Sequence, residues 1–169
     1  MSSRRFAPLV RTSVRTPWLP VGFVADEDGV VIASWFGEPR AIDIAHVDVE
    51  AARKVRHVAG ASDAVVAWVD GDVDAILDVP VDQPGGPFQQ KAWKAMRSVR
   101  GGTTMSYADL ARRAGNPKAV RAAGTACALN HVAPFVPCHR IIHTNGTISA
   151  YGFGPDLKAL LLEHEGALL

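Results

Sequence analysis

Residues 81–87, with the sequence Val-Asp-Gln-Pro-Gly-Gly-Pro, form the densest cluster of helix and strand breakers in the chain. The charge reverses at the same place. Residues 1–86 carry 8 Lys and Arg against 13 Asp and Glu, a net charge of −5, whereas residues 87–169 carry 10 against 4, a net charge of +6. We therefore expect two domains, 1–86 and 87–169, each of roughly 80 residues and able to bury a small core. The basic half is either a solvated face or a surface that follows phosphates.

The first half is predicted to be mixed α/β. Apolar runs at 18–25 and 30–36, separated by the turn residues 26–29, predict an antiparallel hairpin. Weaker patterns predict, in chain order, a helix over 47–58, a short helix or strand over 64–68 and a closing strand over 75–81.

The second half is predicted to be helical. Pro87 can start a helix that buries one stripe and ends at the glycines 101–102; the stripe is Phe88, Ala92, Met96 and Val99. Ser106 and Asp109 form a capping box for a second helix, which Gly115 stops. Asn116 and Pro117 then start a third helix over 118–129. Two helices joined by so short a turn predict a helix-turn-helix.

The helix over 118–129 has almost no bulk beyond Arg121 and Leu129. Gly124 sits in its middle, where glycine costs roughly 1 kcal/mol relative to alanine. Small residues let a backbone approach a partner closely. That partner is either a neighbouring helix or a narrow groove, and the sequence leaves both open.

The chain has two cysteines, Cys127 and Cys138, so no disulfide framework is available and a reducing compartment is expected. Residues 1–10 carry too few apolar residues for a signal peptide, and no run of about 18 apolar residues occurs. We expect a cytoplasmic protein with no membrane partner.

Cys138 is followed by His139 and Arg140. A thiolate is the reactive form of cysteine, and an adjacent cation or a hydrogen-bonded imidazole lowers the thiol pKa from about 8.5 towards neutrality. Adjacency in sequence does not by itself place the imidazole on the sulfur. A structural cysteine therefore remains an alternative on this motif alone.

A longer pattern surrounds this motif. From Phe88 to Glu165 the chain resembles the O6-alkylguanine-DNA alkyltransferases, also called methylated-DNA–protein-cysteine methyltransferases. The matching positions, in order and with the family spacings, are 88–93, 106–111, 115–124, Asn130, 137–142, Gly146, 151–152 and 158–165. The first 86 residues match only weakly. The resemblance implies an α+β protein: an N-terminal RNase H-like α/β domain with an antiparallel sheet, and a C-terminal helical domain with a winged helix-turn-helix.

The resemblance also implies catalytic roles. Cys138 would attack the alkyl carbon of O6-alkylguanine, coupled through a water to His139, whose other ring nitrogen would be held by Glu165. The Tyr151 hydroxyl would hydrogen-bond the guanine O6, and Asn130 would tie the reactive turn to the recognition helix. The stable thioether makes the reaction irreversible, so one molecule repairs one lesion.

Further positions would bind DNA. Tyr107 matches the residue that contacts the flipped nucleotide, and Arg121 matches the side chain that fills the vacated stack. The remaining residues assigned to the DNA-binding surface are Ala122, Ala123, Gly124, Cys127 and Arg140. The expected partner is double-stranded DNA that contains O6-alkylguanine, mainly O6-methylguanine, with O4-methylthymine as a further candidate. We expect a monomer in solution, with clustering on DNA left open.

Cys127 and His131 have a metal-compatible spacing but lack further obvious ligands, so we expect no metal and no cofactor. Three departures from the family pattern concern the pocket wall: His131 where many relatives have Pro, Ala150 where Gly is common, and Gly152 where some carry Ser.

Two alternatives to an alkyltransferase remain. One is a non-catalytic lesion binder of the alkyltransferase-like kind, in which Trp replaces the reactive Cys. The other is a transcription regulator built on the helix-turn-helix, which the small-residue helix disfavours because it offers few side chains to read base edges.

Overall fold

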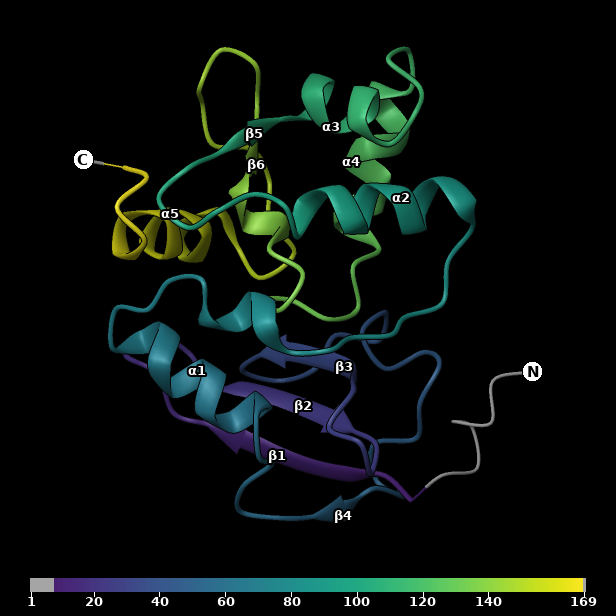
Figure 1. Ribbon diagram of the computed structural model, residues 1–169, viewed down its shortest axis with the longest axis vertical. Coiled ribbons are helices and arrows are strands. Elements are labelled where there is room, and N and C mark those ends of the chain that lie inside the picture. The colour runs from purple at the N-terminus through teal and green to yellow at the C-terminus, as the bar shows by residue number, and fades with distance from the viewer. Residues whose placement is uncertain (1–7, 169) are drawn as a thin grey trace. The chain divides into compact units, whose positions relative to one another are not determined.

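The computed structural model describes residues 8–168, so residues 1–7 of the N-terminal stretch considered above lie outside it. The chain forms two compact units. The N-terminal unit extends to Pro84 and includes His131–Phe135, and the C-terminal unit comprises Gly85–Asn130 and Val136 onwards (Figure 1). The sequence placed a single boundary at 86/87 and therefore assigned residues 131–135 to the second half. No helix among residues 8–168 is long and apolar enough to span a membrane.

The N-terminal unit is built on a four-stranded sheet with the order β3-β2-β1-β4. Its strands are β1 (Val10–Val14), β2 (Val21–Ala25), β3 (Val31–Phe36) and β4 (Arg53–Lys54). β2 pairs with both β1 and β3 in antiparallel register, whereas β4 pairs with β1 in parallel. The predicted hairpin is confirmed as β2 and β3, and β1 was not predicted.

Helix α1 (Ala61–Val69) covers this sheet next to β1 (Figure 1). Its buried face includes Val65 and Trp68, neither of which is exposed to solvent. The Trp68 ring packs against Trp18 and Phe36, with ring centroids 5.6 and 6.4 Å apart. The expected element at 64–68 is therefore a helix.

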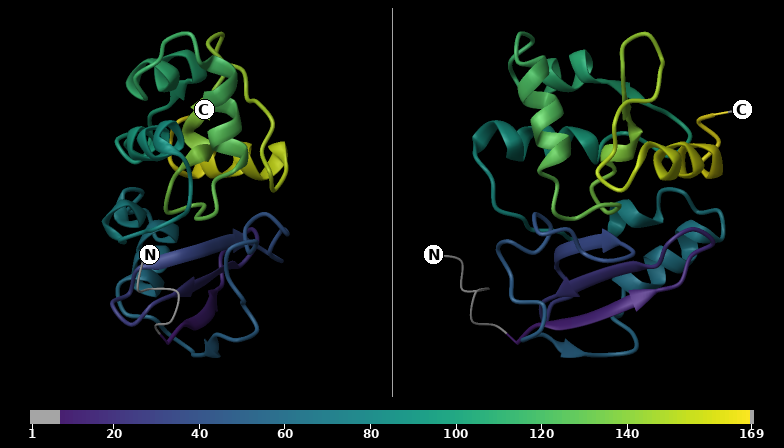
Figure 2. Two further views of the ribbon diagram at one scale, coloured as in Figure 1. Left: turned by 90° about the vertical axis from the view of Figure 1, so that its right-hand side faces the viewer. Right: turned by 180° about the vertical axis from the view of Figure 1, so that it is seen from behind.

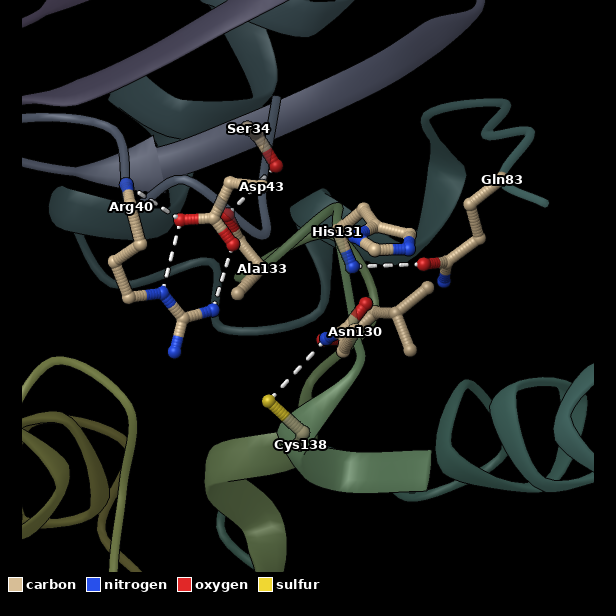
Figure 3. A network of polar contacts seen from close by, with 9 residues as sticks. Ser34, Arg40, Asp43, Gln83, Asn130, His131, Ala133 and Cys138 are labelled. Atoms are coloured by element: carbon tan, nitrogen blue, oxygen red, sulfur yellow. Dashed lines mark hydrogen bonds and ion pairs between the residues drawn. The ribbon is translucent and has the colours of Figure 1, made fainter. Parts of the chain in front are cut away.

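Residues His131–Phe135 add to this sheet although they are distant from it in sequence. Val132 forms a parallel bridge with Ser34, and the Ser34 amide donates to the His131 carbonyl at 2.8 Å. The Ser34 hydroxyl donates to the Ala133 carbonyl at 2.7 Å, and the His131 amide donates to the Gln83 side-chain oxygen at 2.8 Å (Figure 3). These backbone polar groups of the buried segment are thus hydrogen-bonded, as burial requires.

Two expectations for the first half were wrong. Residues 47–58 form turns and the short strand β4 instead of a helix, because pairing with β1 satisfies the backbone there. Residues 75–81 contain the 3-10 helix η2 (Ala75–Asp78), in which the Leu77 amide donates to the Asp74 carbonyl at 3.0 Å. Only Val81 pairs with the sheet, through a single bridge to Val31.

As far as residue 168, the C-terminal unit contains four α-helices and a two-stranded parallel sheet. The helices are α2 (Pro87–Met96), α3 (Tyr107–Arg113), α4 (Val120–Ala128) and α5 (Pro155–His164), and the strands are β5 (Met105–Ser106) and β6 (Ile141–Ile142). Helices α3 and α4 lie side by side in every view (Figures 1 and 2). The expected pair of helices joined by a short turn is confirmed.

The helix boundaries differ in detail from the prediction. The Ser106 hydroxyl accepts from the Asp109 amide at 3.0 Å and caps α3 as expected. Asn116 instead caps a turn, through its side-chain oxygen and the Lys118 amide at 3.1 Å, and α4 starts only at Val120. Of the stripe predicted on α2, Ala92 and Met96 are fully buried, whereas Phe88 is half-buried.

Candidate active site

Cys138 opens the short 3-10 helix η3 (Cys138–Arg140), which joins directly to β6. Its amide donates to the Val136 carbonyl at 2.9 Å, and the Arg140 amide donates to the Pro137 carbonyl at 3.0 Å. These two bonds fold residues 136–140 into a tight turn. Cys138 is 6% exposed, so its thiol is almost entirely shielded from water.

Asn130 follows α4 and holds this turn. Its side-chain nitrogen donates to the Val136 carbonyl at 2.8 Å and to the Cys138 sulfur at 3.2 Å (Figure 3). A carboxamide has two N–H donors, and both are used here. An N–H directed at the sulfur stabilises negative charge on it, so Asn130 both shapes the turn and favours a thiolate.

His139 lies beside Cys138 and is completely buried. Its Nε2 is 2.9 Å from Oε1 of Glu165, the C-cap residue that directly follows α5. A carboxylate only accepts hydrogen bonds, so in the neutral ring Nε2 carries the hydrogen and Nδ1 is the basic nitrogen. The carboxylate therefore prepares the imidazole to take a proton through Nδ1.

Arg140 completes this buried cluster. Its Nε donates to Oε1 of Glu165 at 3.0 Å and its Nη2 donates to Oε2 at 2.5 Å, a two-pronged ion pair. Its Nη1 donates to the Val99 carbonyl at 2.7 Å. Burial by itself raises the pKa of Glu165, but the charges and hydrogen bonds of His139 and Arg140 hold that pKa well below its usual range. Glu165 is therefore ionised near neutral pH.

A second polar cluster in the C-terminal unit consists of Tyr107, Ser149 and Lys158. The Tyr107 hydroxyl is 2.5 Å from the Ser149 Oγ, and Ser149 also accepts from the Lys158 ammonium at 2.8 Å. Burial raises the pKa of Tyr107 and lowers the pKa of Lys158. Tyr151 lies in the same loop as Ser149, is half-buried, and packs its ring on Phe153 with centroids 5.6 Å apart.

The sequence patterns predicted no role for Lys158 or Ser149. Lys158 is 1% exposed, and its ammonium also donates to the Ile141 carbonyl at 2.5 Å. A signal was present in the sequence, because Lys158 precedes Leu161 and Leu162 by three and four residues and so shares their buried face on α5.

The exposed residues of α4 are mostly small, and the larger ones lie at its start, at Val120 and Arg121. Arg121, Ala122, Thr125 and Ala128 are exposed, whereas Ala123 and Ala126 are fully buried. A Cβ added at Gly124 would meet nothing within 4 Å. Packing against a neighbouring helix therefore does not explain this glycine, and the open face remains able to approach an external partner.

Comparisons with known proteins agree with this geometry. Residues 87–167 match the family model described as the 6-O-methylguanine DNA methyltransferase DNA-binding domain. The methylated-DNA–protein-cysteine methyltransferase of Shigella flexneri is 34% identical over 168 residues, which cover 95% of this chain and 98% of the relative. The chain belongs to the methylated-DNA–protein-cysteine methyltransferase family.

Solved methyltransferase structures extend the similarity to both units. The Mycobacterium tuberculosis O6-methylguanine methyltransferase has a TM-score of 0.76 and 28% identity, and the match covers 94% of this chain and 93% of that one. The Mycobacterium tuberculosis OGT in complex with DNA has a TM-score of 0.72 and 30% identity, with 93% and 92% coverage. The bifunctional activator and repair enzyme Ada of Escherichia coli is 47% identical over 92 residues, 54% of this chain but only 26% of Ada.

In this methyltransferase, two of the residues predicted to bind DNA are buried, so those two predictions are wrong. Arg140 is 0% exposed and its guanidinium bonds Glu165 and the Val99 carbonyl, so it presents no surface to DNA. Ala123 is also 0% exposed and faces the interior of its unit. Cys127 is half-buried, and burial raises the pKa of its thiol, so it is a neutral thiol at physiological pH.

Among the residues that the structure describes, no group of three or more His, Cys, Asp or Glu side chains could hold a metal ion. The absence of a metal from the working protein stays a prediction.

Proposed function

We propose that this methyltransferase repairs DNA by moving an alkyl group from O6 of guanine to the sulfur of its own Cys138. The observation that carries the proposal is the position of the sulfur. It accepts a hydrogen bond from Asn130, and the neighbouring His139 ring is held by a buried, ionised Glu165. Such a group is a nucleophile with an adjacent base, and the base is oriented by a third residue.

The reaction balances with the groups present. The Cys138 thiol gives its proton to Nδ1 of His139, through a bridging water by analogy with the family, and the imidazolium is stabilised by Glu165. The sulfur attacks the alkyl carbon, a carbon–sulfur bond forms, and the carbon–oxygen bond breaks. Its electron pair leaves with the guanine, which takes up one proton, equivalent to the one that the Cys138 thiol gave to His139, and becomes normal guanine. Tyr151 is proposed to hydrogen-bond O6 as that charge develops.

On the DNA side, α4 is proposed to enter the minor groove with its small-residue face, and Arg121 to occupy the space of the extruded base. Support comes from the exposure of Arg121 and Ala122, the open surroundings of Gly124 and the DNA complex of the Mycobacterium tuberculosis protein. We further infer that residues 87–169 act as a winged helix-turn-helix domain and residues 1–86 as an RNase H-like one, and that the protein is a monomer that repairs O6-methylguanine in duplex DNA.

The test is the intact mass of the protein after mixing with a duplex that carries one O6-methylguanine. We expect a gain of about 14 Da, at one methyl per protein, mapped to the peptide that contains Cys138. The matched controls are the Cys138→Ser variant and an undamaged duplex, neither of which should give the gain. A protein that binds the lesion duplex yet keeps its mass would instead be a non-catalytic lesion binder.

A further inference from the structure

Four residues of the C-terminal unit form a continuous polar chain that the proposed mechanism does not use. Lys158 of α5 donates to the Ile141 carbonyl on β6 and to the Ser149 hydroxyl, at 2.5 and 2.8 Å. Ser149 in turn lies 2.5 Å from the hydroxyl of Tyr107, the first residue of α3. The Lys158 ammonium is also 5.9 Å from the centre of the Tyr107 ring. Ser149 and Lys158 are 7% and 1% exposed.

The hydrogen-bond donors and acceptors that each side chain carries constrain the direction of these bonds. An ammonium can only donate, so Ser149 accepts from Lys158. Ser149 then keeps one hydrogen of its own, and Tyr107 is the neighbour within hydrogen-bond distance. If Ser149 donates to the phenol oxygen, the Tyr107 hydrogen is directed away from Ser149. Hydrogen bonds in such a chain polarise one another, and a charged first donor strengthens the series.

We infer that Ser149 and Lys158 are positioning residues for Tyr107: the Lys158 ammonium polarises the Ser149 hydroxyl, which donates to the Tyr107 oxygen and leaves the Tyr107 hydroxyl hydrogen to donate to the extrahelical base. No covalent bond changes in this relay, and Lys158 keeps its proton. The inference rests on the proposed function, because it requires a flipped base in contact with Tyr107.

The charges around Tyr107 are consistent with this direction. Lys158 faces it from α5, Cys127 from α4 and Cys138 from η3, and the His143 ring lies 5.6 Å from the Tyr107 ring. Burial lowers the pKa of Lys158, whereas negative charge on Cys138 raises the pKa of Lys158. Formation of the Cys138 thiolate therefore favours the charged ammonium that the relay needs.

The first test is a double-mutant cycle with Ser149→Ala and Tyr107→Phe, read as the single-turnover rate of methyl transfer from an O6-methylguanine duplex. Ser149→Ala should slow transfer about tenfold while the Kd for the duplex stays within about twofold. Ser149→Thr, which keeps the hydroxyl, should restore the rate. In the Tyr107→Phe background, Ser149→Ala should have no further effect. Equal losses in both backgrounds would overturn the relay.

The second test reads the direction of the bond. The chain has two tyrosines, so a Tyr151→Phe background leaves Tyr107 as the sole phenol for a spectrophotometric titration. A bond donated to the phenol oxygen favours the phenolate, so Ser149→Ala should raise the Tyr107 pKa in this background. A fall in that pKa would show that Tyr107 donates to Ser149 and would refute the inference.

The matched control is Thr147→Ala, which removes a hydroxyl from the same loop. That hydroxyl donates to the Asn145 side chain at 2.7 Å and stays within an exposed turn, so transfer should be unchanged. Failure of the relay and failure of the proposed function are distinguishable, because the wild-type protein in the same assay reports methyl transfer independently. If the wild-type protein gains the methyl group and the Ser149→Ala variant transfers methyl at the wild-type rate, only the relay is refuted and the proposed function stands.

Discussion

The two units bury polar side chains of different kinds. In the N-terminal unit, Asp26, Ser34, Ser62 and Gln83 bond backbone groups of turns and of the segment His131–Phe135. The buried carboxylate of Asp43 pairs with the half-buried Arg40 guanidinium and also accepts from the Arg40 amide. In the C-terminal unit the buried set includes four ionisable residues, which are His139, Arg140, Lys158 and Glu165. A buried charge is expensive unless it is paired, and the linked group of His139, Arg140 and Glu165, which adjoins Cys138 in the chain, indicates chemistry more than stability.

This difference distinguishes buried polar side chains that stabilise the fold from those that also serve methyl transfer. Most of the buried polar groups of the N-terminal unit replace water for the backbone, and Asp43 also holds the Arg40 side chain. Their loss should affect folding alone. In the C-terminal unit, His139, Arg140 and Glu165 orient one another directly after Cys138 in the chain, and their loss should affect both folding and methyl transfer. The following predictions test that separation.

The largest effect is expected for Glu165→Gln. The change leaves the buried Arg140 guanidinium without its carboxylate, so the free energy of unfolding in urea should fall by about 3–5 kcal/mol. Methyl transfer should also slow, since the imidazolium of His139 loses its counter-charge. The control is Glu50→Gln, which removes an ion pair with Arg11 whose Glu50 side chain is 84% exposed; it should cost about 0–1 kcal/mol. Similar costs for both variants would contradict the distinction.

The same carboxylate should make stability depend on pH. The pKa of Glu165 is depressed in the folded protein, so the unfolded chain binds its proton first as the pH falls. The contribution of Glu165 is complete above its unfolded pKa of about 4.3 and is lost progressively at lower pH. Urea unfolding between pH 7 and pH 3 should therefore show a steeper acid loss in the wild-type protein than in Glu165→Gln. Parallel curves would argue against an ionised, stabilising Glu165.

A smaller effect is expected for Ser34→Ala in the N-terminal unit. The change leaves the Ala133 carbonyl without the bond that it accepts from the Ser34 hydroxyl, at a cost of about 1–3 kcal/mol in the free energy of unfolding. The single-turnover rate of methyl transfer should not change under conditions where the variant is folded. Ser13→Ala on the exposed face of β1 is the control and should stay within about 0.5 kcal/mol of the wild type. A loss of transfer by folded Ser34→Ala would show that N-terminal polarity also serves the reaction.

The smallest effect on stability is expected for Arg121→Ala, because Arg121 is exposed on α4. Its free energy of unfolding should stay within about 0.5 kcal/mol of the wild type. Repair of a duplex should slow about tenfold, since the vacated stack is no longer filled, whereas reaction with free O6-benzylguanine should be nearly unchanged. Equal losses with both substrates would exclude a role in base flipping.

Local signals predicted much of this protein. The hairpin of β2 and β3, the cap of α3 at Ser106 and the start of α2 at Pro87 follow from turn and capping residues that act over a few positions. Elements that depend on distant partners were wrong or missed. Residues 47–58 form turns and an edge strand because β1 is available to pair with them, and β1 itself was not recognised.

The residues of the candidate site also differ in whether a local sequence pattern could predict them. The sequence predicted Cys138, His139, Glu165 and Asn130 as site residues, because a dense motif fixes their spacing. The structure places the Asn130 amide on the Cys138 sulfur and the His139 ring on Glu165, and the catalytic roles stay predictions. The sequence assigned Arg140 and Ala123 to the DNA-binding surface, but both are buried, and a local motif does not show which side chains point into the protein. It assigned nothing to Ser149 and Lys158, whose contacts join a loop to two helices and a strand.

The sequence by itself determined the family and the order of the helices and predicted Cys138 as the nucleophile, because spacing and turn chemistry depend on residues that are close together in the chain. Tertiary structure alone decided which charges are buried and what they touch. Residues 131–135 lie between Asn130 and Cys138 in the chain, yet they pair with β3 in the N-terminal unit. That placement depends on the hydrogen bonds and apolar surface offered by residues about a hundred positions away, which no local pattern encodes.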